Sequence, residues 1–173
     1  AFVNVHSSAA ASSFSGSSSS IPSSSSSSER LTPLGRMLAA LPMDVRLAKA
    51  LVYACLLQCV GPVLTAAAAL GTGRPLFASL PPGDLRSEAE RAKKKLARQA
   101  IASRSDHLAL VEAFNAWDRV CGESSSGGGG GGGRRAGKDF SGDNFLSEGA
   151  LEATRSARAD LARTLSELGL LDR

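Results

Sequence analysis

The chain has 173 residues, a net charge of +4 and three cysteines. This length is typical of one domain. An odd and sparse cysteine content argues against a disulfide-stapled secreted scaffold and favours a reducing, intracellular compartment. The first residues lack the basic and long apolar regions of a signal peptide. Because the chain starts with Ala1, we expect it to be a fragment or a processed product.

Two tracts of low complexity flank the segments that can fold. Residues 7–28 contain 15 serines, and residues 127–133 are seven consecutive glycines. Such tracts bury almost no apolar surface and cannot offset the entropy lost on ordering. The sequence therefore predicts a disordered lead over 1–29 and a flexible insert over 122–138.

Helix signals begin directly after the serine tract. Thr32 precedes Pro33, a typical N-cap followed by proline at the first helical position. Apolar residues at helical spacing continue to Leu41, and Pro42 ends the pattern. Asp44 is a candidate cap for a second helix, which we expect to extend through residue 59.

A third helix is predicted after the Gly61-Pro62 break, ending near Leu70. Residues 50–70 contain no charged side chain and are long enough to span a bilayer. The break in the middle, the high alanine content and the lack of flanking aromatics favour two short buried helices instead. We expect no membrane partner.

Cys55 and Cys59 are four residues apart, a spacing that could place two metal ligands on one helical face. The chain has no CxxC pair, and its only histidines are His6 and His107. Thiols buried among apolar side chains explain these cysteines better than a metal site.

The excess of positive charge is concentrated in residues 84–104, which hold seven basic and three acidic side chains. We expect one helix over residues 85–102 with an apolar stripe that starts at Leu85. At ~100° per residue, its basic side chains fall on the opposite face. A polyanion partner fits this pattern, and so does a solvated surface helix. The four basic residues of this face are Arg91, Lys94, Lys95 and Arg98.

Two further helices complete the pattern. Ser105 is a candidate cap for a helix whose inner face includes Phe114 and Trp117. Trp117 could stack on a base, but its spacing favours a place in the core. The last helix is expected from about Ser147 to Leu168. We predict an all-α fold, a bundle of about six to seven helices with short connections.

Catalytic motifs are absent from the sequence. No GxxxxGK[ST] phosphate loop and no DExH segment occur, so we expect no ATP hydrolysis by this chain and no cofactor bound to it. Ser105, Asp106 and His107 have the residue types of a hydrolase triad. Because consecutive side chains at a helix start diverge, a capping serine with a first-turn aspartate is the better interpretation.

Four phrases resemble the helicase-associated region of DEAH-box RNA helicases. They occur in a matching order over residues 30–171. Ser141 stands where the family usually has cysteine, and Gly142 replaces a common basic residue. The four phrases are Leu-Thr-Pro-Leu-Gly-Arg (31–36), Leu-Pro-Met-Asp-Val-Arg-Leu-Ala-Lys (41–49), Ser-Asp-His-Leu-Ala-Leu (105–110) and Phe-Ser-Gly-Asp-Asn-Phe-Leu-Ser (140–147).

The resemblance implies that residues 30–43 are the end of a winged-helix domain and that 44–171 form a ratchet-like helical bundle. In this family the bundle lies beside two motor domains, which bind ATP and Mg²⁺, and helps to guide single-stranded RNA. A helical protein-interaction module that has no motor is the alternative. The predicted RNA contacts are Arg91, Lys94, Lys95, Arg98, His107 and Asn144.

Overall fold

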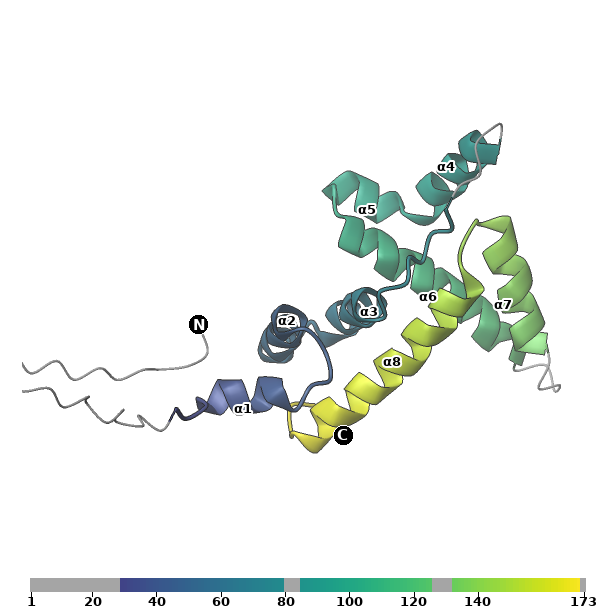
Figure 1. Ribbon diagram of the computed structural model, residues 1–173. Coiled ribbons are helices and arrows are strands. Elements are labelled where there is room, and N and C mark those ends of the chain that lie inside the picture. Colours follow the sequence, from purple (N-terminus) through teal and green to yellow (C-terminus); the bar gives the residue numbers. More distant parts are fainter. Residues whose placement is uncertain (1–28, 80–84, 126–131, 172–173) are drawn as a thin grey trace, which may run out of the picture.

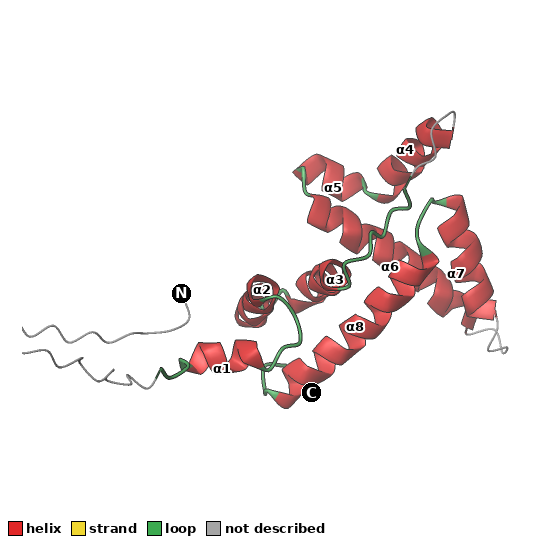
Figure 2. Cartoon of the chain, viewed as in Figure 1, coloured by secondary structure: helices red, strands yellow, loops and turns green. Residues whose placement is uncertain are grey.

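The computed structural model describes residues 29–79, 85–125 and 132–171, and these residues are almost entirely helical (Figures 1 and 2). The one extended pairing in these ranges is an antiparallel bridge between Phe77 and Leu146. The all-α prediction is confirmed, and the described residues form eight helices where about six to seven were predicted. They are α1 (Pro33–Ala39), α2 (Val45–Leu56), α3 (Val60–Gly71), α4 (Leu85–Leu96), α5 (Arg98–Ser103), α6 (Asp106–Ser125), α7 (Gly132–Asp143) and α8 (Glu148–Glu167).

Three helices begin at the capping residues that the sequence predicts. The Thr32 hydroxyl accepts a hydrogen bond from the Gly35 amide at 3.0 Å, with Pro33 in the first turn of α1. The Asp44 carboxylate caps α2, and the Ser147 hydroxyl caps α8. Each cap satisfies an amide that the helix itself leaves without a partner.

The break between α2 and α3 lies earlier than predicted. Helix α2 ends at Leu56, and Gln58 has a left-handed backbone with φ of 56°. Gly61 and Pro62 fall inside the first turn of α3, where proline is tolerated because those amides have no helical partner. The prediction that placed Cys59 on the second helix is therefore wrong.

The environments of Cys55 and Cys59 also differ from the prediction that both thiols are buried. Cys121 is buried, Cys55 is half-buried and Cys59 is exposed. Burial raises the pKa of the Cys55 thiol, and the neighbouring Cys59 raises it further. Within the three described ranges, no group of three potential metal ligands is found.

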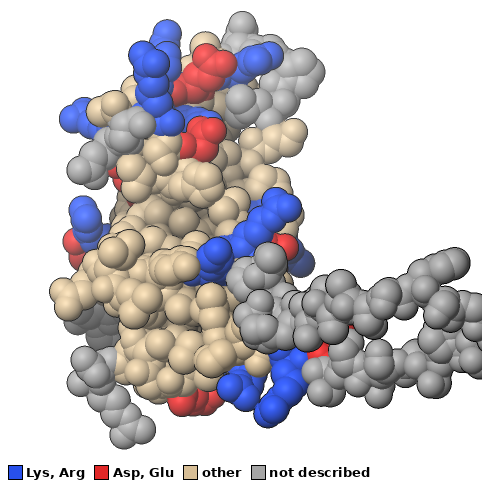
Figure 3. Space-filling model, turned by 90° about the vertical axis from the view of Figure 1, so that its left-hand side faces the viewer, with Lys and Arg blue, Asp and Glu red and all other residues tan. Residues whose placement is uncertain are grey.

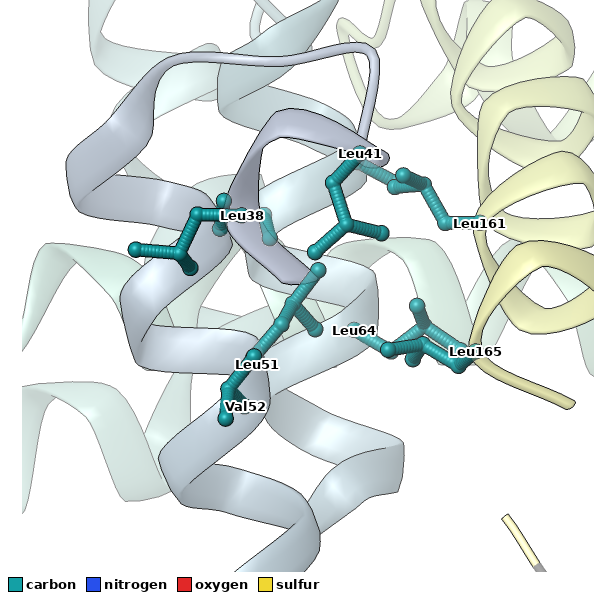
Figure 4. Close-up of a cluster of buried hydrophobic side chains, with 10 residues drawn as sticks. Leu38, Leu41, Leu51, Val52, Leu64, Leu161 and Leu165 are labelled. Atoms are coloured by element: carbon teal, nitrogen blue, oxygen red, sulfur yellow. The ribbon is translucent and has the colours of Figure 1, made fainter. Parts of the chain in front are cut away.

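One long helix joins two hydrophobic clusters. The first cluster is formed by α1, α2, α3 and the second half of α8, with Leu51 and Leu165 fully buried (Figure 4). The second is formed mainly by α6, the first half of α8 and the loop residues Leu76 and Leu146, with Phe140 of α7 packed against it. Because α8 contributes Leu151 to one cluster and Leu165 to the other, it joins the two parts of the bundle (Figure 1).

The flexible insert predicted over 122–138 is largely helical where it is described. Residues 122–125 extend α6, and α7 begins at Gly132. Small residues at a spacing of four, namely Gly133, Gly137 and Ser141, are buried on one face of α7. This stripe lets the α7 backbone approach α6 closely, so tertiary packing overrides the low helix propensity of glycine.

The single helix predicted over residues 85–102 is two helices. The chain breaks at Ala97, whose backbone has φ of −106° and ψ of 45°. Ala97 and Ala100 form a small cluster with Ala109 of α6, so the break places both alanines against one neighbour. Leu85, predicted to face the core, is 49% exposed.

Other predictions concern the membrane and the residues outside the described ranges. The uncharged segment 50–70 is divided between α2 and α3, and none of the described helices has the length and apolarity to cross a bilayer. The lead at 1–28 and the glycines at 127–131 lie outside the described residues.

Candidate nucleic-acid interface

The predicted basic face lies mainly on α4. Ala89 is the side chain of this helix that is buried, and the other side of the helix faces solvent. Glu88 in the first turn and the lysines in the last turn interact favourably with the helix dipole and so stabilise the helix. An exposed i,i+4 ion pair joins Arg86 to Glu90 at 3.5 Å and adds little stability.

Three of the predicted contact residues stay together on this helix. Arg91, Lys94 and Lys95 are all exposed. Among the described residues, none of the three takes part in an ion pair. Their charged ends are therefore available to phosphate groups, and binding would not disturb the buried side of α4.

The helix break separates Arg98 from the other three basic residues. Arg98 is exposed as the first residue of α5, beyond Ala97. The basic side chains that one continuous helix would place on a single face are therefore divided between two helices. Whether Arg98 contacts the same ligand stays a prediction.

Lys93 belongs to the same lysine run but has a different position. Its Nζ lies 4.8 Å from the centre of the Phe77 ring, a cation–π contact. Phe77 pairs with Leu146, and the Ala78 amide donates to the Phe145 carbonyl at 2.9 Å. These contacts link the C-terminal turn of α4 to the segment between α7 and α8, so Lys93 holds α4 in place.

His107 lies away from the basic face of α4. It is exposed in the first turn of α6 and lines an apolar cavity of about 420 Å³ with α2 and α3. The Ser105 hydroxyl accepts a hydrogen bond from the Leu108 amide at 3.4 Å, which fits the capping interpretation of Ser105. The structure does not bring His107 together with the α4 residues.

Asn144 is half-buried in the turn after α7. Its amide nitrogen donates to the Phe140 carbonyl at 2.9 Å and so helps to end α7. The next residue, Phe145, has a left-handed backbone with φ of 54°. This geometry gives Asn144 a structural role in the turn, and a role in RNA contact stays a prediction.

A second set of basic side chains was not predicted as a candidate site. Arg134, Arg135 and Lys138 are exposed on α7, away from its buried stripe of small residues. The spacing of Gly133 and Gly137 is the signal that could have predicted a helix with an outward basic face here.

Trp117 is buried and unavailable for base stacking. It is 1% exposed, and its indole Nε1 donates to the Gly137 carbonyl at 3.1 Å. The Arg155 guanidinium lies 4.1 Å from the ring centre and donates to Asp118 at 2.9 Å. Burial lowers the pKa of Arg155, but its hydrogen bonds with Cys121 and Asp118, together with the nearby Glu152 and Asp118 charges, raise the pKa overall. The core position predicted for Trp117 is confirmed.

The charge distribution follows the helices. In Figure 3, lysine and arginine side chains gather at the upper end, at the height where Figure 1 shows α4 and α5. A broad surface with few charged side chains lies below them in the same view. Further lysine and arginine side chains lie lower on the same face, so basic side chains are not confined to the α4–α5 end.

Comparison with known proteins identifies the central part of the chain. Residues 44–110 match the family model described as helicase associated domain (HA2), ratchet-like. The chain is 35% identical over 141 residues to the human putative ATP-dependent RNA helicase DHX57, which covers 82% of this chain. It is 34% identical over 144 residues to DExH-box ATP-dependent RNA helicase DExH3 of Arabidopsis thaliana, covering 83% of this chain.

The human ATP-dependent DNA/RNA helicase DHX36 is 32% identical over 147 residues, covering 83% of this chain. The matched part is a small share of each relative: 9% of DHX57, 11% of DExH3 and 13% of DHX36. Residues 44–110 are thus a ratchet-like helicase-associated domain, and the chain carries the helicase-associated region of DEAH-box and DExH-box RNA helicases.

Proposed function

We propose that this chain is an accessory segment of an ATP-dependent DEAH-box RNA helicase and that it guides single-stranded RNA beside the motor domains. The observation that carries the proposal is the exposed basic face of α4, formed by Arg91, Lys94 and Lys95. This face lies within the part of the chain that matches the ratchet-like family model.

The role is accessory because the sequence has no phosphate loop and no DExH segment. ATP and Mg²⁺ would bind to motor domains, located on the same polypeptide or on a partner chain. Those domains would supply the stepping motion. The α4 face would contribute sequence-independent attraction to the RNA backbone, in an intracellular compartment.

Binding of a labelled single-stranded oligouridine, followed by fluorescence anisotropy over a range of salt concentrations, tests this proposal. If about three phosphates are engaged, the log of affinity should fall with the log of salt at a slope of about 2. Replacing Arg91, Lys94 and Lys95 together by Gln should weaken binding similarly for unrelated sequences and flatten the slope. A separate Arg98→Gln variant reports whether α5 takes part.

The matched control removes the same amount of charge elsewhere. Arg30, Arg36 and Arg46 are also exposed and lie at the α1–α2 end. Their joint replacement by Gln should leave most of the affinity. Equal loss in both triple variants would mean that only net charge matters. Unchanged affinity in the α4 variant would favour the alternative, a protein-interaction module.

A further inference from the structure

A groove opens where α4, α5 and α6 meet, and it shares Lys94 with the exposed basic face of α4. Its volume is about 570 Å³, within the range of about 300–1,000 Å³ typical of ligand pockets. Three small side chains line it, Ala97, Ala100 and Ala109, which also pack together as one cluster. Because these side chains are short, the groove stays open between the helices.

Ile101 gives the groove an exposed apolar wall. It lines the groove and is 54% exposed. Covering the exposed part of this side chain removes apolar area from water, which favours binding. A partner that covers Ile101 would therefore gain from the hydrophobic effect.

The rim of the groove carries basic side chains that no acidic neighbour pairs with among the described residues. Of the lining residues, Lys93 lies over the Phe77 ring, and Glu90 pairs with Arg86. Lys94 and Arg104 also line the groove, and among the described residues neither has an ion pair.

The fixed backbone at Arg104 places one of these charges at the corner between α5 and α6. Arg104 ends α5 with a left-handed backbone, φ of 52°, and its amide donates to the Ile101 carbonyl at 3.3 Å. The remaining charged lining residue, Asp106, lies in the first turn of α6, where the helix dipole stabilises a carboxylate. The rim therefore presents net positive charge to an incoming ligand.

We propose that this groove docks an amphipathic α-helix of a protein partner. The apolar face of that helix would cover the three alanines and Ile101, and acidic residues on its flank would face Lys94 and Arg104. The mostly apolar lining and the charge complementarity favour this occupant over nucleic acid. Among the residues that line the groove there is no aromatic ring on which a base could stack. The proposal is independent of the RNA-guiding role.

A labelled helical peptide of about 15 residues tests the proposal with the full chain. The probe carries leucines at i, i+4 and i+7 with glutamates on both sides of that stripe. A matched peptide has lysine in place of every glutamate. We expect the acidic probe to bind more tightly than the lysine version in anisotropy titrations. In nitrogen-15 NMR spectra, the shifted amides should lie between residues 94 and 109.

Variants of this chain locate the site. Ile101→Ser should weaken probe binding about tenfold because it removes the apolar wall. Arg104→Asn should weaken it about threefold at low salt, and asparagine tolerates the left-handed backbone there. Leu57→Ser is the control for Ile101, since Leu57 is 74% exposed but outside the groove. Arg46→Gln is the control for charge, since Arg46 is exposed and outside the groove, and both controls should bind normally. Circular dichroism confirms that each variant is folded.

Three results would overturn the proposal. The first is equal affinity of the acidic probe for all four variants, which would place its binding elsewhere. The second is equal or tighter binding of the lysine peptide. The third is a set of shifts at residues 97–109 caused by oligouridine but not by the acidic probe, which would make the groove an RNA subsite. Lys94 is the residue that the groove shares with the Arg91, Lys94 and Lys95 face, and none of the four variants changes it.

Discussion

Arg155 and Trp117 show how single side chains join two helices. The Arg155 guanidinium covers the indole ring and also bonds Asp118, so one residue of α8 makes two kinds of contact with α6. The indole nitrogen is in turn satisfied by the α7 backbone at Gly137. A buried aromatic with its polar atom paired is a stable core arrangement.

We predict that Trp117→Ala lowers the free energy of unfolding by about 3–5 kcal/mol, because it leaves a large cavity and removes the ring beneath Arg155. Trp117→Phe should cost less, since it keeps an aromatic ring and loses the hydrogen bond to Gly137 and only part of the ring volume. Urea unfolding monitored by circular dichroism measures both variants. RNA affinity of the folded Trp117→Phe protein should be unchanged; a selective loss of RNA binding would instead support base stacking.

The contact between α6 and α7 depends on small residues along α7. An ideal Cβ built on Gly137 would lie 2.5 Å from the Cys121 sulfur and 3.0 Å from the Trp117 indole nitrogen. Gly142 is in the same helix, and a Cβ there would meet nothing within 4 Å. One helix therefore contains two glycines with opposite packing requirements.

Gly137→Ala should destabilise the protein by about 1–3 kcal/mol, because α7 must move away from α6 or the tryptophan must shift. Gly142→Ala should leave stability equal or raise it by about 0.5 kcal/mol, since alanine favours the helix and the site has room. Thermal and urea unfolding of the two variants are compared directly. The packing argument fails if both substitutions change stability by the same amount.

At the scale of the whole molecule, α8 determines how the two hydrophobic clusters are joined. One 20-residue helix supplies side chains to both of them. The α4–α5 pair is attached at the edge of the second cluster, through Leu96, a small alanine cluster and the Lys93–Phe77 contact. The candidate RNA face and the proposed docking groove are therefore both built on this outlying pair (Figure 1).

The purified chain should show no ATPase activity with or without RNA. Hydrolysis requires a phosphate loop and an acidic residue that holds Mg²⁺, and the sequence has neither motif. Steady-state phosphate release is the measurement. Turnover that persists after repurification, at a level above buffer controls, would contradict the accessory role.

The sequence by itself determined those features of the fold that depend on residues close together in the chain. The caps at Thr32, Asp44 and Ser147 were predictable because each is a short-range hydrogen bond between neighbours in the chain. The helical class and the core position of Trp117 followed from the spacing of apolar residues. The exposed α4 cations were predictable for the same reason.

Tertiary structure decided the features that depend on distant neighbours. Helix α7 forms because its small residues allow close packing against α6, although glycine alone disfavours a helix. The helix predicted over residues 85–102 breaks at Ala97, where Ala97 and Ala100 pack with Ala109. The same break separates Arg98 from the other cations and opens the groove beside Ile101. No local pattern contains these contacts, because each depends on residues brought together only by folding.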